Sequence, residues 1–95
     1  MPFPQQTPKP FTRADVVALG PGQEGCYGLY VANGQWVYVG RGDLRDRLLA
    51  HLNGDNACIN GARPTHFVTV VTRNSEVEEK KLIEEMKPRC NFKVG

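Results

Sequence analysis

The chain has 95 residues, of which 40% are hydrophobic and 23% are charged, with a formal net charge of +2. This length suits one small globular domain, and no apolar run approaches the ~18 residues that a membrane-spanning helix needs. No secretory or lipidation signal is visible, so we expect a cytoplasmic protein without membrane association.

Four prolines among polar residues mark residues 1–11, which we expect to form a flexible, extended tail. Residues 12–95 would then form the domain. Thr12 is placed to cap a short helix that stops at Gly20. This helix carries Val16, Val17 and Leu19, and we assign it a structural role.

Two runs rich in Tyr, Val, Leu and Trp meet at Asn33-Gly34 and predict a β-hairpin. Asn-Gly is typical of the two-residue type I′ turn, because both central residues of that turn need a positive φ. Such a turn predicts these cross-strand pairs: Ala32 with Gln35, Leu29 with Tyr38, and Tyr27 with Gly40.

The hairpin is expected to place two tyrosines on one face of the sheet. Because side chains alternate along a strand, one face should carry Tyr27, Leu29 and Val31 together with Trp36, Tyr38 and Gly40. Tyr27 and Tyr38 would be diagonal neighbours about 7 to 8 Å apart, so both hydroxyls could reach one small group. The alternative is that the rings only pack the sheet, where aromatic residues are favoured.

A helix is predicted directly after the hairpin. Residues 40–42, Gly-Arg-Gly, end the second strand, and Asp43 follows as the helix N-cap. An apolar stripe at every fourth position should pack on the sheet: Leu44, Leu48 and Leu52. Arg47 and His51 are also four residues apart, so both should project from one side of the helix beside the leucines.

Residues 52–64 are rich in Gly and Asn, and we expect an irregular loop there. Long loops often contact ligands, and this one offers candidates for nucleic-acid contact in Asn53, Asn56, Asn60 and Arg63. A passive connection is the alternative. Residues 66–72, HFVTVVT, are mostly β-branched and predict a buried third strand. We interpret His66 at its start as a structural or surface residue.

The last predicted helix carries an acid on its apolar face. Ser75 and Glu78 fit a capping box at its start. Glu79 instead shares a face with apolar residues at i+3, i+4 and i+7, namely Leu82, Ile83 and Met86. A carboxylate directed inward needs a cation or a shifted pKa. The helix is expected to stop at Lys87, which precedes a proline.

Three cysteines, Cys26, Cys58 and Cys90, are widely spaced and form no CxxC pair. Their odd number and spacing suit free thiols in a reducing compartment. A zinc site built from Cys58, Cys90, His51 and His66 is the alternative, although this spacing matches no zinc-finger pattern.

Taken in order, these motifs resemble the GIY-YIG nuclease family over roughly residues 25–91. The resemblance is carried by Gly25-Cys26-Tyr27, Tyr38-Val39-Gly40, Arg47, Glu79 and Asn91, with His51 at the place of the histidine of homing-type and restriction-type members. It implies an α+β fold with a small three-stranded antiparallel sheet, formed by the hairpin and the third strand and flanked by helices.

The resemblance also implies a metal-dependent endonuclease that hydrolyses DNA phosphodiester bonds. Glu79 would hold Mg²⁺, with Mn²⁺ as a substitute, and Arg47 would stabilise the phosphate. Tyr38 with His51 would activate the attacking water, with Tyr27 orienting it. A phenol is a weak base, so Tyr38 would need a neighbouring cation to lower its pKa. In a variant of this scheme Tyr38 is a covalent nucleophile.

Three further residues would bind the DNA substrate: Arg41, Arg45 and Asn91. For Asn91 the alternative is that its side chain anchors the C-terminal segment. The net charge of +2 is small for a nucleic-acid binder, so non-specific affinity should be weak.

A non-catalytic nucleic-acid-binding or partner-binding module is the alternative function. No helix-turn-helix or zinc-finger segment is recognisable. Any specificity would therefore come from substrate shape, the loop at 52–64, a homodimer or a specificity-conferring protein partner.

Overall fold

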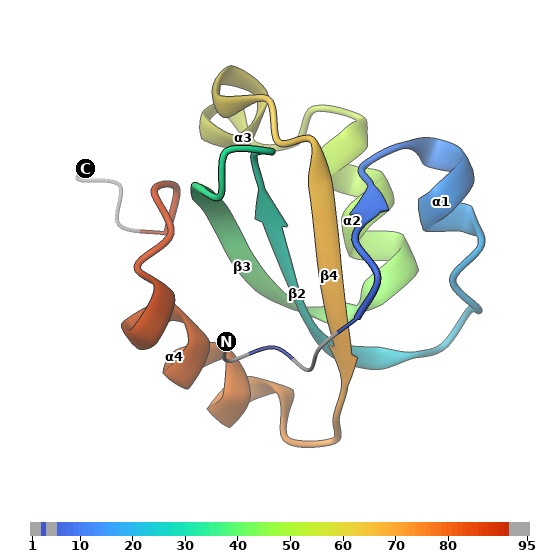
Figure 1. The fold of residues 1–95 in the computed structure, drawn as a ribbon. Helices are drawn as coiled ribbons and strands as arrows, with labels where there is room; N and C mark the ends of the chain where they lie inside the picture. Colours follow the sequence, from blue (N-terminus) through green and yellow to red (C-terminus); the bar gives the residue numbers. More distant parts are fainter. Residues whose placement is uncertain (1–2, 4–5, 92–95) are drawn as a thin grey trace.

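The computed structural model describes residue 3 and residues 6–91, which together form an α+β arrangement (Figure 1). The strands of this part of the chain are β1 (Lys9–Pro10), β2 (Glu24–Tyr30), β3 (Trp36–Asp43) and β4 (His66–Val71). Its helices are α1 (Arg13–Val17), α2 (Leu44–Leu52), α3 (Ala57–Ala62) and α4 (Ser75–Met86). None of these helices is long and apolar enough to cross a membrane.

The strands form one antiparallel sheet in the order β1-β4-β2-β3. The hairpin and the third strand were expected, and they are β2, β3 and β4. The prediction of three strands is wrong by one, because β1 pairs with the outer edge of β4, with Lys9 opposite Phe67. A strand of two residues that contains a proline has no alternating pattern from which it could be predicted.

The described residues before Thr12 contact the sheet. Phe3 is buried and stacks on Trp36, with 5.9 Å between ring centroids. The side chain of Gln6 exchanges two hydrogen bonds with the backbone of Thr69, at 2.9 and 3.1 Å. The rest of the segment for which we expect a tail, residues 1–2 and 4–5, lies outside the described residues.

The hairpin has the predicted register in its body, with Leu29 opposite Tyr38 and Tyr27 opposite Gly40. Its turn is different. Gly34 alone has a positive φ of 95°, and the backbone of Val31, rather than that of Ala32, pairs with Gln35. The loop therefore has three residues and is not a type I′ turn.

A β-bulge compensates for the extra loop residue. The register shifts by one position between Leu29 and Tyr30, so that Tyr30 lies opposite Trp36. A bulge places two consecutive side chains on one side of the sheet, and here Val37 and Tyr38 both join the same core cluster. The prediction that Trp36 shares the face of Tyr38 is consequently wrong, because Trp36 packs in the opposite cluster.

The sheet separates two hydrophobic clusters, one on each face. Helices α1 and α2 lie on one side of the sheet and α4 on the other (Figure 1). On the first face, helices α1, α2 and α3 cover Tyr27, Leu29 and Phe67, with Leu44 and Leu48 as the predicted stripe of α2. On the second face, α4 packs Leu82 against four side chains: Phe3, Cys26, Val39 and Val68. Cys26 thus points away from the tyrosines, as the sequence predicts.

The C-terminal segment protects β3, which is an edge strand of the sheet. The backbone N–H of Cys90 donates to the carbonyl of Val37 at 2.7 Å. The Asn91 side chain accepts from the backbone N–H of Val39 at 2.7 Å and donates to its carbonyl at 2.9 Å. This is the anchoring role considered for Asn91.

A disulfide joins Cys90 to Cys58 in α3, with 5.7 Å between their Cα atoms. The prediction of free thiols is therefore wrong for these two cysteines, and among the described residues only Cys26 is free. The zinc alternative is wrong as well, since both of its thiolate ligands are consumed by the disulfide.

Side-chain caps explain where several helices begin. Thr12 caps α1 and Asp43 caps α2, both as predicted. Asn56 caps α3, so the expectation of an irregular loop over residues 52–64 is wrong. The capping box is wrong too, because Ser75 lies inside α4 and its hydroxyl donates to Glu24 at 2.7 Å.

Candidate functional site

Tyr27 and Tyr38 project from the same face of the sheet, as the register predicts, with 6.2 Å between their ring centroids. Tyr27 is 1% exposed and comes from the central strand β2, whereas Tyr38 comes from the edge strand and is only partly buried. Tyr38 is therefore the more accessible of the two phenols.

His51 in the last turn of α2 contacts both tyrosines. Its Nε2 lies 2.6 Å from the Tyr27 hydroxyl, and its ring packs edge-on against Tyr38 with 5.2 Å between centroids. Its Nδ1 lies 2.8 Å from Oδ1 of Asp55. Both ring nitrogens are thus engaged, and the histidine is 3% exposed.

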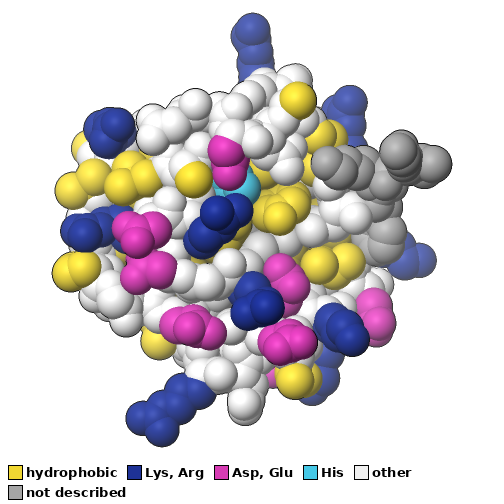
Figure 2. All heavy atoms as spheres, turned by 180° about the vertical axis from the view of Figure 1, so that it is seen from behind, with side chains coloured by type: hydrophobic (Ala, Val, Ile, Leu, Met, Phe, Trp, Pro, Cys, Tyr) yellow, Lys and Arg dark blue, Asp and Glu magenta, His cyan; other side chains and the backbone are white. Residues whose placement is uncertain are grey.

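Arg47 lies one helical turn before His51 and points the same way. Its Nη2 is 3.7 Å from Oδ2 of Asp55, so that one carboxylate contacts both residues. Figure 2 shows a histidine between a basic and an acidic side chain on this face, with hydrophobic side chains beside them. The i, i+4 spacing of Arg47 and His51 produces the convergence that the sequence predicts.

Glu79 reaches the site from the other side of the sheet. Its Oε1 lies 3.7 Å from Nε of Arg41 on β3, and its side chain is 25% exposed. It is therefore turned toward the sheet edge rather than out to solvent. The candidate site spans the edge strand: α2 and the tyrosines lie on one face, and Glu79 and Arg41 lie on the other.

Burial dominates the protonation equilibria of the site. It raises the pKa of Tyr27, a shift that Tyr38 increases and Arg47 opposes. Burial also raises the pKa of Tyr38. The negative charge of Glu79 raises this pKa further, and the positive charge of Arg47 lowers it. The expectation that a neighbouring cation brings the pKa of Tyr38 down is thus not met, because burial and Glu79 outweigh Arg47.

The pKa values of His51 and Glu79 shift in opposite directions. Burial lowers the pKa of His51, against the opposing effect of Asp55, so His51 is neutral at pH 7. Burial raises the pKa of Glu79, with Arg41 opposing the shift and Glu76 adding to it. The pKa of the Arg47 guanidinium is raised, chiefly by Tyr27, so that it stays charged.

Of the three residues expected to bind substrate, Arg41 pairs with Glu79 in the site. Arg45 is two positions from Arg47, and residues with that spacing are about 200° apart around a helix. Asn91 is joined by two hydrogen bonds to Val39, which follows Tyr38 on β3.

The donor set near Glu79 fits a hard cation that takes one protein carboxylate. In the part of the chain that the structure describes, no three His, Cys, Asp or Glu side chains gather as a metal-binding group. Mg²⁺ commonly takes one or two carboxylates and completes its octahedron with water and substrate phosphate. A half-buried carboxylate that faces an exposed arginine is compatible with this kind of binding.

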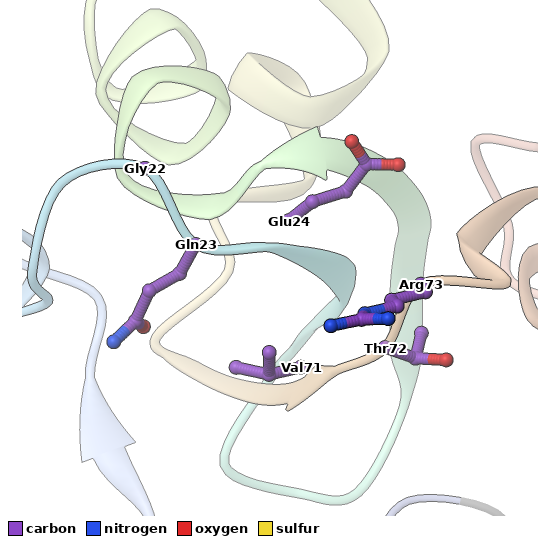
Figure 3. Close-up of a pocket in the computed structure, with 6 residues that line it drawn as sticks. All are labelled: Gly22, Gln23, Glu24, Val71, Thr72 and Arg73. Atoms are coloured by element: carbon purple, nitrogen blue, oxygen red, sulfur yellow. The ribbon is translucent and has the colours of Figure 1, made fainter.

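Two further hollows are lined by neither Tyr27 nor Tyr38. The larger one, at the ends of β2 and β4, is lined by Gly22, Gln23, Glu24, Val71, Thr72 and Arg73 (Figure 3) and contains no predicted site residue. The smaller one borders His51 and is lined by Phe11, Leu52, Ile59, Asn60, Arg63 and Pro64. It brings Asn60 and Arg63, both candidates for nucleic-acid contact, next to the site.

Asp55 is the residue of this site that the sequence analysis does not identify. It lies four residues after His51, but Asn53 is the C-cap of α2 and Gly54 has a φ of 88°, so helical i, i+4 spacing does not apply to it. The signal that could have located it is Asn53-Gly54, because a glycine after the C-cap turns the chain back toward the last turn of the helix.

No family model and no curated protein matches this chain.

Proposed function

We propose that this protein is a metal-dependent endonuclease that hydrolyses DNA phosphodiester bonds at the edge of β3. One observation carries the proposal: the edge strand that bears Tyr38 has Arg47 of α2 on one face, beside the contact of Tyr38 with its histidine neighbour, and Glu79 of α4 on the other. A cation and a carboxylate on either side of a partly accessible phenol suit a phosphate and the metal that accompanies it. The motif resemblance to GIY-YIG nucleases agrees with this assignment.

Arg47 would bind the scissile phosphate. Its guanidinium is always charged, and donors that are held in place before the reaction stabilise the charge that grows on the non-bridging oxygens. Arg41 is 42% exposed at its side chain and pairs with Glu79 at 3.7 Å. An exposed pair of this kind is weak, so Arg41 is free to turn to a DNA phosphate.

The roles expected for the two phenols are exchanged in this scheme, because Tyr27 rather than Tyr38 lies within hydrogen-bond distance of His51. The proton of the attacking water would pass through Tyr27 to His51. The Tyr27 hydroxyl lies 2.6 Å from Nε2 of His51. Because Nδ1 of the neutral ring faces the Asp55 carboxylate and carries the proton, Nε2 is the acceptor and the hydroxyl donates. As the oxygen of water bonds to phosphorus, its proton moves to the Tyr27 oxygen while the Tyr27 proton moves to Nε2. No free tyrosinate is needed, which matters because the pKa of Tyr27 is raised by burial. Tyr38, the more accessible phenol, would orient the water.

Glu79 would hold Mg²⁺, which when bound supplies positive charge beside the leaving oxygen. The bond between phosphorus and the leaving oxygen then breaks, and that oxygen takes a proton from solvent. A bound cation would stabilise the ionised form of the Glu79 carboxylate, which burial disfavours, as its raised pKa indicates.

The test is nicking of supercoiled and branched DNA by the purified chain with Mg²⁺, with Mn²⁺ or with EDTA. We expect activity with either metal, none with EDTA, and losses of about a hundredfold or more in Glu79→Gln and Arg47→Ala. Glu84→Gln, at an exposed acid of the same helix that is not among the causes of the Glu79 pKa shift, is the matched control and should retain activity.

Activity that survives in EDTA or in Glu79→Gln would reject the metal-dependent scheme. Tyr27→Phe and Tyr38→Phe separate the two phenols: the relay requires the larger loss of kcat in Tyr27→Phe. A protein-DNA adduct on denaturing gels would instead indicate covalent attack by a tyrosine. DNA binding without cleavage by the wild type, unchanged in Glu79→Gln, would favour a binding module.

A further inference from the structure

Asp55 is the only acid among the described residues that contacts both the imidazole and the guanidinium of the candidate site. Oδ1 lies 2.8 Å from His51 Nδ1, and Oδ2 lies 3.7 Å from Arg47 Nη2. We propose that Asp55 is a positioning residue that fixes the tautomer of His51. This proposal rests on the proposed nuclease function and assigns a role to a residue that no motif includes.

The position of Asp55 is built into the backbone. Its N–H donates to the carbonyl of Ala50 at 3.3 Å, and that of Gly54 donates to the carbonyl of His51 at 3.1 Å, a pair of hydrogen bonds that ends α2 in a Schellman motif. Gly54 before it has a φ of 88°, and its carbonyl accepts from the Asn60 side chain at 3.2 Å. Asn56 directly after it caps α3. The carboxylate is therefore held between two helices rather than on a free loop.

The chemistry of a carboxylate decides the tautomer. An ionised carboxylate can only accept hydrogen bonds, so the proton of neutral His51 must lie on Nδ1. Nε2 then carries the lone pair that accepts from Tyr27. Without Asp55, the imidazole could take the other tautomer, with Nε2 protonated and unable to receive a proton.

Titratable and charged side chains face His51 from each element that packs against it. Tyr27 and Tyr38 face it from the sheet, Arg47 from its own helix, Asp55 from the α2–α3 connection, and Arg63 borders the hollow beside it. Asp55 raises the pKa of His51, whereas burial and Arg47 lower it. Removal of Asp55 should therefore lower the pKa of His51 further.

The experiment compares the full-length wild type with Asp55→Ala and Asp55→Glu, and with Asp46→Ala as the matched control. Asp46 is an exposed acid in the first turn of α2, the helix that carries His51. Two quantities are measured: the tautomer and pKa of His51 by ¹H–¹⁵N NMR, and the pH profile of DNA nicking. The NMR measurement does not depend on activity.

In Asp55→Ala we expect a lower pKa of His51, partial loss of the Nδ1–H tautomer, and about a tenfold or greater fall in kcat, within the usual contribution of a positioned general base. The acid limb of the pH profile should move to lower pH, because His51 must be neutral to accept a proton. Asp55→Glu should restore part of the rate, and Asp46→Ala should match the wild type.

If the tautomer and pKa of His51 and the pH profile of nicking are the same in Asp55→Ala as in Asp46→Ala, the role proposed for Asp55 is overturned, but the nuclease proposal is not. A wild type that nicks no DNA with either metal would instead overturn the nuclease proposal. If Asp55→Ala does not fold, Asp55→Asn replaces it: this variant keeps an acceptor, removes the charge, and must still lower the pKa of His51.

Discussion

Gly40 on β3 lies directly opposite Tyr27 on β2, and the phenol oxygen of Tyr27 occupies the space that a side chain at position 40 would need. A Cβ at this position would overlap the hydroxyl of Tyr27 and crowd the ring of Tyr38. Gly40 thus leaves room for the hydrogen bond between Tyr27 and His51.

Gly40→Ala should therefore disturb both stability and site geometry. We expect a loss of about 1 to 3 kcal/mol in the free energy of unfolding, as is usual for overpacking, together with reduced nicking. Urea denaturation and the nicking assay measure the two effects. Gly61→Ala in α3 is the control, because a Cβ there meets no neighbouring atom and alanine favours a helix. Equal stability of the two variants would contradict this account.

Stability should depend on pH through His51. Its pKa in the folded protein is lowered by burial from the ordinary value of 6.5, so in the window below pH 6.5 the unfolded chain binds more protons than the folded one. The free energy of unfolding should then rise with pH up to about 6.5 and lose this dependence above it. Urea midpoints between pH 5 and 8 measure the trend.

In His51→Gln this contribution to the slope should disappear, and in the control His66→Gln it should remain. A slope below pH 6.5 that is identical in His51→Gln and the wild type would assign the pH dependence to other groups.

The disulfide between Cys58 and Cys90 should be measurable by counting thiols. The unreduced, denatured protein should react at one cysteine, Cys26, and the reduced protein at all three. The double variant Cys58→Ser/Cys90→Ser should lose about 3 kcal/mol of stability, since the bridge closes a loop with a sequence separation of 32 residues. Three reactive thiols without reduction would contradict the pairing.

Cys26 should resist alkylation in the folded protein. It is fully buried, and burial, with help from Glu79 and Glu78, raises the pKa of its thiol to about 11. Only the thiolate is a good nucleophile. Iodoacetamide at pH 7.5 should leave the native chain unmodified at Cys26 and label it in urea, as mass spectrometry can follow. Rapid labelling of the native protein would show that this core opens.

Phe3→Ala tests whether the first residues belong to the folded sheet. Phe3 is 2% exposed and packs on Trp36, the single tryptophan of the chain. We expect a loss of about 3 kcal/mol in the free energy of unfolding and a shift in tryptophan fluorescence. Thr7→Ala, at an exposed position, is the control. An unchanged stability in Phe3→Ala would favour the flexible tail expected from the prolines.

The sequence by itself determined the parts of the fold that depend on neighbours along the chain. The Asp43 cap, the leucine stripe of α2 and the pairing of Arg47 with His51 follow from helical spacing. The shared face of Tyr27 and Tyr38 follows from strand alternation. The three-residue turn and the bulge were not predicted, but the one-residue shifts that they introduce cancel, so the body of the hairpin keeps the predicted register.

Tertiary structure decided what depends on residues far apart in sequence. The strand at Lys9–Pro10 exists only because β4 offers it an edge, and the disulfide only because α3 and the C-terminal segment meet beside β3. Asp55 joins the site because the turn at Gly54, which ends α2, brings its carboxylate back to His51. Burial then sets the pKa of His51 and both tyrosines, and burial is a property of the packed molecule rather than of any short segment.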